Sequence, residues 1–381
     1  MNRNHWIMAA AMAAFSAQAM AQTAFHAGDV VVERVGDGAT ASSGNAFPVS
    51  VLEYSTSGTL VQTIGLKAAG TQPTSAPYNL TDSENATSDG YLNRSADGKF
   101  ITVSGYNATP GTASVASSAS ATVGRTIGVI SSGGVATTPL AVSMLSGNNY
   151  RSVISDGTNY WASGGNGVVY VTAGGSVTSL SSGNARVAEI FNTTLYISSS
   201  STTFNGASSP LGIWRLGTAG SLPTATATAT NVIATGTGSS PYDFAFSPSG
   251  NWAYVADDRA SASGGIQLWK NTGSAFTLQY TLGTGVSNIG ARGLTVDFSN
   301  FNDTTGKGAL IYATTAESTL NRLIAINDQG SGSAATTLAT ATANYIFRGV
   351  DFTPVPEPAT YAAIFGLAAL GLVAWRRRAR A

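Results

Sequence analysis

The feature that most restricts the fold of this chain is a group of four short segments in its second half. Residues 242–246, 252–257, 265–269 and 276–280 are rich in β-branched and aromatic residues, and turn residues such as those at 247–250 separate them. Segments of this kind, joined by short turns, are typical of neighbouring strands in an antiparallel sheet. We therefore predict one four-stranded sheet, the unit that forms a blade of a β-propeller.

Weaker copies of this four-strand unit recur along the chain. They cover residues 91–142, 150–180, 185–233 and 292–338. A last unit would combine one strand at 345–352 with three strands at 29–35, 48–54 and 59–64. Pairing the two ends in this way covers sheet edges that would otherwise be exposed. We predict an all-β fold, a β-propeller of six blades closed by the N- and C-terminal strands; seven blades, a β-helix and a sandwich are the alternatives.

The composition agrees with an extracellular β protein. Glycine makes up 44 of 381 residues, and only 10% of the residues are charged. The chain has no cysteine, which excludes disulfides, a thiol nucleophile and zinc–thiolate sites. Five of the 19 basic residues lie in the two end segments, so the body between them is net negative. An acidic body argues against nucleic acid as a partner.

The N-terminus has the layout of a secretory signal. Arg3 is followed by an apolar run at 6–15 and by Ala19-Met20-Ala21. This pattern predicts a signal peptide at 1–21, cleaved before Gln22, with the Sec translocon and signal peptidase as partners. The apolar run is too short to span a bilayer as a helix; an uncleaved membrane anchor is the alternative.

The C-terminus has a second three-part layout. Pro356-Glu357-Pro358 precedes an uncharged stretch at 359–375, and an arginine cluster follows it. The cluster consists of Arg376, Arg377, Arg378 and Arg380. The stretch is about 25 Å long as a helix, which predicts a single transmembrane helix. The arginines should stay cytoplasmic, so the body would face the periplasm.

This order of elements resembles the PEP-CTERM sorting domain of Gram-negative bacteria that make extracellular polysaccharide. The resemblance covers 354–381, and Pro356, Glu357 and Pro358 carry its motif. It implies recognition by the membrane enzyme exosortase and cutting near these three residues. The precursor would be anchored transiently in the inner membrane and then reach the cell surface or the exterior. An ordinary tail anchor is the alternative, and the propeller domain is assigned to 22–353.

The clearest four-strand unit has a resemblance of its own. Its segment from Ser247 to Asp257, Ser-Pro-Ser-Gly-Asn-Trp-Ala-Tyr-Val-Ala-Asp, is similar to blades of the YVTN and lactonase-like propellers. This resemblance supports a propeller and transfers no activity.

Four arginines stand near the starts of expected inner strands, where loops converge at the mouth of a propeller. They are Arg151, Arg186, Arg292 and Arg348. A ring of guanidinium groups would suit a carboxylate or sulfate on an acidic exopolysaccharide. In the alternative interpretation these arginines pair with carboxylates such as Asp297 and Asp351, or cap carbonyl groups between blades.

Little in the body suggests enzymatic chemistry. His26 is the one histidine after the signal peptide, which argues against a Ser-His-Asp triad and against a histidine metal site. The adjacent pair Asp257-Asp258 could serve a calcium site or glycosidase-like acid/base chemistry, but turn formation explains it as well. Four tryptophans are expected in the core between blades: Trp161, Trp214, Trp252 and Trp269.

The sequence therefore predicts a non-enzymatic exported protein with no catalytic residues, metal or cofactor. Its propeller would act in binding or structure in an exopolysaccharide matrix or biofilm. The alternative is a secreted lactonase- or glycosidase-like hydrolase that uses loop carboxylates.

Overall fold

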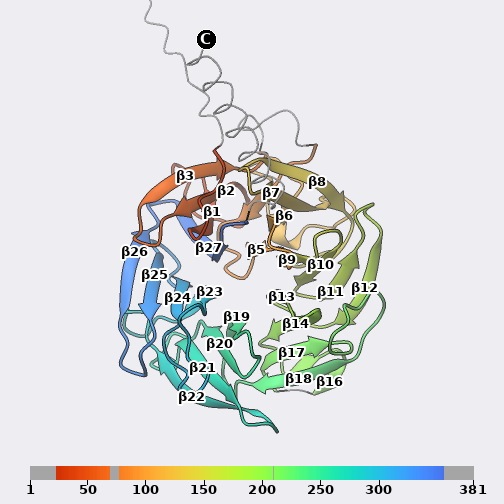
Figure 1. Ribbon diagram of the computed structural model, residues 1–381. Coiled ribbons are helices and arrows are strands. Elements are labelled where there is room, and N and C mark those ends of the chain that lie inside the picture. The colour runs from red at the N-terminus through yellow and green to blue at the C-terminus, as the bar shows by residue number, and fades with distance from the viewer. Residues whose placement is uncertain (1–22, 69–76, 209, 356–381) are drawn as a thin grey trace, which may run out of the picture.

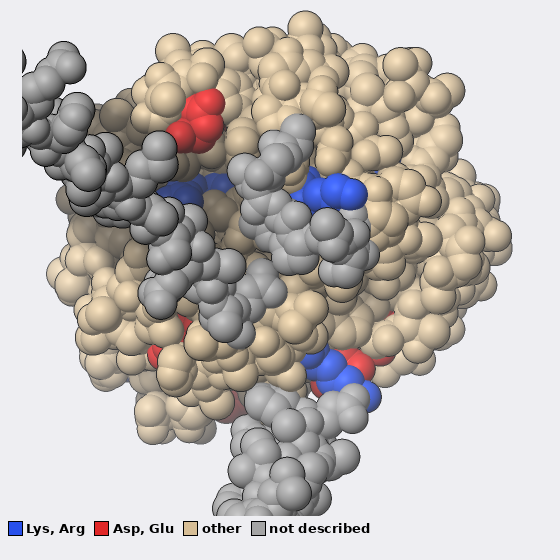
Figure 2. Space-filling view, turned by 90° about the horizontal axis from the view of Figure 1, so that it is seen from above, with Lys and Arg blue, Asp and Glu red and all other residues tan. Residues whose placement is uncertain are grey.

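The computed structural model describes residues 23–68, 77–208 and 210–355. Within these residues the fold is all-β, with 27 strands and one short 3-10 helix, η1 (Val115–Ser117). The sheets stand in a ring around a central axis, as Figure 1 shows, and most of the described surface seen from above in Figure 2 is uncharged. This arrangement confirms the all-β, propeller-like prediction.

Four blades are separate four-stranded antiparallel sheets, in which the first strand lies nearest the axis and the last lies at the rim (Figure 1). The first two comprise β9 (Tyr150–Ser155), β10 (Tyr160–Gly164), β11 (Gly167–Val171) and β12 (Val177–Ser182), then β13 (Ala188–Phe191), β14 (Thr194–Ser199), β17 (Gly212–Leu216) and β18 (Ala229–Ala234). The other two comprise β19 (Pro241–Phe246), β20 (Trp252–Asp257), β21 (Gly265–Asn271) and β22 (Phe276–Leu282), then β23 (Ala291–Asp297), β24 (Leu310–Thr315), β25 (Arg322–Asn327) and β26 (Ala335–Thr340). All four agree with the units expected from the sequence.

The rest of the ring is one nine-stranded sheet. It contains β27 (Tyr345–Phe352), β1 (Val30–Gly36), β2 (Ala46–Tyr54), β3 (Leu60–Gly65), β4 (Thr81–Ser83), β5 (Asn93–Arg94), β6 (Phe100–Tyr106), β7 (Arg125–Ser131) and β8 (Ala136–Val142). β1 pairs antiparallel with β2 on one side and with β27 on the other, so the two ends of the body close the ring as predicted. β4, which the sequence did not indicate, pairs with both β2 and β6 and joins two four-strand groups. A small hairpin, β15 (Thr203–Phe204) and β16 (Ala207–Ser208), lies outside the blades.

The core lies between neighbouring sheets. The four tryptophans expected there, Trp161, Trp214, Trp252 and Trp269, are all buried. Two of their indole N–H groups donate to backbone carbonyls, from Trp161 to Pro223 at 2.7 Å and from Trp252 to Asp303 at 2.7 Å. Trp161 and Trp252 thus connect their blades to the next blade by both packing and a hydrogen bond.

The two targeting segments are not part of this description. The signal peptide at 1–21, the Pro356-Glu357-Pro358 motif, the helix at 359–375 and the arginines at 376–380 all lie outside the described residues. Within the described part of the chain, no helix is long and apolar enough to cross a membrane.

Candidate functional site at the central axis

Two tyrosines close the central axis of the ring. Tyr91 precedes β5 and Tyr242 lies on β19, on the other side of the ring (Figure 1). Both residues are buried, and their ring centroids are 5.6 Å apart with an interplanar angle of 33°. The inner strands are close enough for the Tyr91 N–H to donate to the carbonyl of Arg151 at 2.9 Å. The axis is therefore filled by side chains at this level.

The four arginines predicted from the sequence converge on this tyrosine pair. The guanidinium carbon of Arg186 lies 3.8 Å from the ring centroid of Tyr242, and that of Arg292 lies 5.8 Å away. The other two, Arg151 and Arg348, interact electrostatically with the Tyr91 hydroxyl. Residues that are far apart in sequence thus form one basic layer.

Each arginine of this layer already uses at least one of its donors, and three of the four cap backbone carbonyls. Arg151 donates to the carbonyl of Ala185 at 2.8 Å, Arg186 to that of Pro241 at 3.0 Å, and Arg348 to that of Glu84 at 2.5 Å. Arg292 instead forms an ion pair with Asp258, at 3.0 Å. Among the described residues none of the four pairs with Asp297 or Asp351. Capping of carbonyls between blades therefore describes Arg151, Arg186 and Arg348 better than pairing with Asp297 or Asp351 does.

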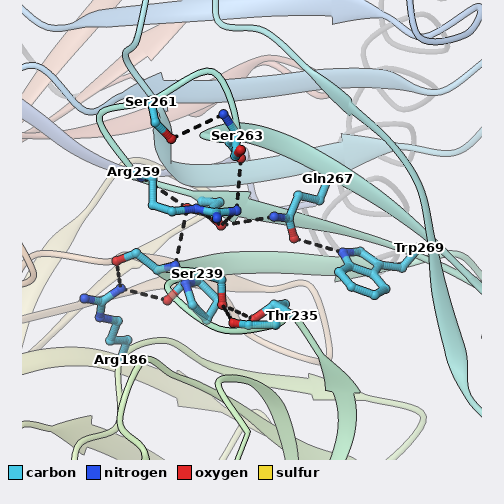
Figure 3. Close-up of polar contacts among 12 residues, drawn as sticks. Arg186, Thr235, Ser239, Arg259, Ser261, Ser263, Gln267 and Trp269 are labelled. Carbon is cyan, nitrogen blue, oxygen red and sulfur yellow. Dashed lines mark hydrogen bonds and ion pairs between the residues drawn. The ribbon is translucent and has the colours of Figure 1, made fainter.

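Arg186 also connects the axis to a polar network in the neighbouring blade, drawn in Figure 3. Its guanidinium donates to Ser240 Oγ at 2.9 Å, and the Ser240 N–H donates to Asp257 at 3.3 Å. Asp257 is fully buried, pairs with Arg259 at 2.8 Å and accepts a bond from Gln267 at 3.0 Å. Because its neighbour Asp258 is held by Arg292, neither member of the predicted carboxylate pair is free.

A buried acidic cluster lies behind Arg348, and the sequence did not indicate it. Glu33 on β1, Asp82 on β4 and Asp89 are all fully buried. A Cβ on Gly90, whose φ is +79°, would lie 2.6 Å from Glu33 Oε1 and 3.0 Å from Asp82 Oδ2, so only glycine leaves room for these carboxylates. Burial raises the pKa of Glu33 to about 8, and the charge of Arg348 opposes that rise.

A second acidic layer lies three residues further along the inner strands. Glu189 follows Arg186 at this spacing and Asp351 follows Arg348, about 10 Å along a strand. These two carboxylates line a cavity of about 150 Å³, and the charge of Asp243 acts on Glu189 there. Its apolar lining includes Phe191, Phe244 and Phe246.

The carboxylates of Glu189, Asp243 and Asp351 are held differently. Asp243 accepts backbone N–H groups from Phe244 and Leu294, both at 2.9 Å, and Asp351 accepts the N–H of Phe352 at 2.7 Å. The carboxylate of Glu189 makes no hydrogen bond to the described residues. Burial raises the pKa of Glu189, and the neighbouring charges of Asp243 and Asp351 add to the rise. A protonated carboxyl beside an ionised one can transfer a proton.

The cavity neighbours a wider pocket of about 570 Å³ near the end of the described chain. Arg94, Phe298 and Phe352 contribute to its lining, and so does Val355, the last described residue before Pro356. The Arg94 N–H donates to Asp351 at 2.5 Å, which connects the walls of the two spaces. The Arg-x-x-acid spacing at 186/189 and 348/351 was the one sequence signal that could have indicated this layer.

Residues 354–378 match the family model of the PEP-CTERM protein-sorting motif. This chain carries a PEP-CTERM motif. The PEP-CTERM motif is the signal of an exported, exosortase-sorted protein, made as a membrane-anchored precursor and processed for the cell surface. No curated protein matches the sequence significantly.

Solved structures resemble the body in fold. A chain of the nidogen/laminin complex is 11% identical with a TM-score of 0.50, and the match covers 86% of this chain and 100% of that one. The periplasmic gluconolactonase of Pseudomonas aeruginosa is 13% identical with a TM-score of 0.49, at 86% and 100% coverage. A Bacteroides uniformis protein provisionally described as a 6-phosphogluconolactonase is 14% identical with a TM-score of 0.45, at 83% coverage of both chains. Two of these three solved structures are described as lactonases, the group whose blades the segment from Ser247 to Asp257 resembles.

Proposed function

We propose that this protein is a six-bladed propeller that binds an anionic polysaccharide outside the inner membrane and has no enzymatic activity. In this proposal the nine-stranded sheet counts as two blades joined by β4, because β27-β1-β2-β3 and β5-β6-β7-β8 each repeat the four-strand order of the other sheets. The PEP-CTERM signal carries the body to the periplasmic face and then to the exopolysaccharide matrix or biofilm of a Gram-negative cell.

The observation that carries the proposal is the pair of arginines around Tyr242. Arg186 and Arg292 lie 3.8 and 5.8 Å from its ring and remain partly exposed, unlike Arg151 and Arg348. Arg292 uses Nε for Asp258, and its two terminal nitrogens have no partner among the described residues. Of these two guanidinium groups only that of Arg292 forms an ion pair with a carboxylate, so the pair of arginines favours a carboxylate or sulfate ligand.

The test is binding of the exported protein to an acidic and to a neutral polysaccharide at two salt concentrations. Arg186→Gln and Arg292→Gln should each weaken binding of the acidic polymer by about tenfold. Arg322→Gln removes an arginine that pairs with Glu317 at 3.5 Å on a blade surface, and it should leave binding unchanged. Equal binding by all three variants would reject the arginine pair as the binding site.

One observation favours a second candidate, a hydrolase. Glu189 and Asp351 line the 150 Å³ cavity, and Asp243 lies close enough to act on Glu189, which supplies converging carboxylates on inner strands rather than on loops. The cavity is smaller than the roughly 300–1,000 Å³ of ordinary ligand sites, so a substrate would have to enter through the 570 Å³ pocket beside it. Hydrolysis of a lactone or glycoside that Glu189→Gln abolishes would favour this candidate. Absence of hydrolysis, together with polysaccharide binding, would exclude it.

A further inference from the structure

A turn immediately before β1 brings the one histidine of the body beside two carboxylates. The Asp29 N–H donates to the carbonyl of His26 at 3.3 Å, and Gly28 between them has a φ of +89°. A positive φ at the third position of such a turn favours glycine. The turn therefore brings the side chains of His26 and Asp29 close together, with one ligand atom of each within 4.8 Å of the other.

The third group comes from the end of β2. Glu53 is fully buried, and its Oε1 lies 3.3 Å from His26 Nδ1. One ligand atom each from His26, Asp29 and Glu53 lies within 4.8 Å of the other two. Among the described residues this is the single group of three such side chains that meets this distance.

The distance between His26 Nδ1 and Glu53 Oε1 fits two ligands of one metal better than a strong ion pair. Tetrahedral zinc has bonds of about 2.0–2.2 Å to nitrogen and oxygen, which puts neighbouring ligand atoms about 3.3 Å apart. A charge-assisted hydrogen bond would instead be about 2.7–2.9 Å long. The observed distance of 3.3 Å between His26 Nδ1 and Glu53 Oε1 equals the spacing of two zinc ligands.

Two hydrogen bonds hold the buried Glu53 carboxylate in place. Glu53 Oε1 accepts the backbone N–H of His26 at 2.6 Å, and Oε2 accepts Gln62 Nε2 at 2.6 Å. Such bonds orient metal-binding carboxylates in known sites. Burial raises the pKa of Asp29, the charge of Glu53 adds to the rise, and His26 opposes it. A bound cation would relieve the repulsion between the two carboxylates.

We propose that His26, Asp29 and Glu53 bind one divalent transition metal ion, of which Zn²⁺ is the representative, with solvent completing the coordination. An imidazole ligand favours zinc-like ions over calcium or magnesium. The argument from the sequence against a histidine metal site rested on the single histidine. The fold supplies two carboxylate ligands instead.

The proposed site would also strengthen the closure of the ring. Thr353, at the end of β27, donates its N–H to the carbonyl of Asp29 at 3.0 Å and its hydroxyl to that of His26 at 2.7 Å. A metal held by the same turn would restrain the point where the last strand ends, three residues before Pro356. Metal binding should therefore raise the melting temperature.

The test uses the exported protein after removal of metals with EDTA. Titration with Zn²⁺ should show one equivalent bound and a higher melting temperature, and titration with Co²⁺ should give the absorption bands of a tetrahedral site. His26→Gln and Asp29→Asn should each weaken Zn²⁺ binding at least tenfold. Asp156→Asn, at an exposed turn without a histidine, is the matched control and should bind like the wild type.

Two results would overturn the site: no stoichiometric Zn²⁺ binding by the wild type, or equal binding by the wild type and both variants. Asp29 is only partly buried, so its replacement tests the site without removing the buried Glu53 carboxylate. The melting temperature of each variant without metal shows that it is folded. Because His26 is the one histidine of the body, its NMR signals identify the bound nitrogen directly.

Discussion

The rings of Tyr91 and Tyr242 meet at 5.6 Å although their inner strands belong to blades on different sides of the ring. Between them lie the sheets β9–β12 and β13–β18 in one direction and β23–β26 with β27-β1-β2-β3 in the other. This contact makes the axis a packed core at the level of the arginine layer. A ligand at this end would therefore contact the arginines at the rim of the axis rather than pass through it.

The contribution of Tyr91 should come from its ring and not from its hydroxyl. Its hydroxyl oxygen is buried and has no hydrogen-bond partner among the described residues. Tyr91→Phe should change the free energy of unfolding by less than about 1 kcal/mol, whereas Tyr91→Ala should lower it by about 3–5 kcal/mol. Urea denaturation at constant m-value measures both. A phenylalanine variant as unstable as the alanine variant would show that the hydroxyl has a partner.

Stability should fall as pH rises because Glu33 keeps its proton in the folded state. The pKa of Glu33 is raised from about 4.5 in the unfolded chain to about 8, mainly by burial. Between these values the folded state binds a proton that the unfolded state has released, so the free energy of unfolding decreases with pH. The stabilisation is complete below about pH 4.5 and is lost as the pH rises through about 8.

Glu33→Gln tests this directly, because an amide does not titrate. The variant should show a flatter dependence of the urea midpoint on pH between 5 and 8 than the wild type. Part of the slope should remain, since burial also raises the pKa of Asp82 and Asp89. The control Glu317→Gln, in the ion pair with Arg322, should keep the full slope. Identical slopes for all three proteins would contradict the assignment to Glu33.

The strands of the blade β19–β22 could be predicted because local signals agree there. Runs rich in aromatic residues predicted its strands at 242–246 and 252–257, and the turn between them is closed by the Gly250 N–H donating to the Ser247 carbonyl at 2.8 Å. β4 carries no such signal. Its three residues, Thr81–Ser83, become a strand only because β2 and β6 are already in place to pair with them.

The site residues also differ in whether a local sequence signal predicts them. The arginines could be predicted as a group because each stands near the start of an inner strand, but the carbonyl partners of three of them come from other blades. The meeting of Glu189 with Asp243 and Asp351 joins three different sheets. A strand carboxylate is ordinarily solvent-exposed, so apart from its spacing from Arg186 nothing in the sequence around Glu189 indicated that it lies near two other carboxylates.

Closure of the ring should depend on β1 packing between its two neighbours. Val32 is fully buried and lies opposite Leu52 on β2 and Val350 on β27. Val32→Thr keeps the shape but buries a hydroxyl, which should cost about 1–3 kcal/mol of unfolding free energy. Val61→Thr makes the same change on β3 at a residue that is 37% exposed, and it should cost less than about 0.5 kcal/mol. Equal losses of unfolding free energy in urea denaturation would mean that β1 contributes no more to the stability than β3.

The sorting motif should act through Glu357 and leave the propeller untouched. The last inner strand ends at Phe352, and Thr353 is tied to the turn before β1, so a cut near Pro356 to Pro358 lies beyond the final blade. Glu357→Gln should leave the precursor uncut and anchored in the inner membrane, because the motif at 354–378 is what the sorting enzyme recognises. Mass spectrometry of the mature protein and fractionation of membrane, surface and medium measure the outcome. Glu317→Gln, the same change within the body, should be processed normally. If Glu357→Gln has the mass and location of the wild type, the C-terminus works as a plain membrane anchor.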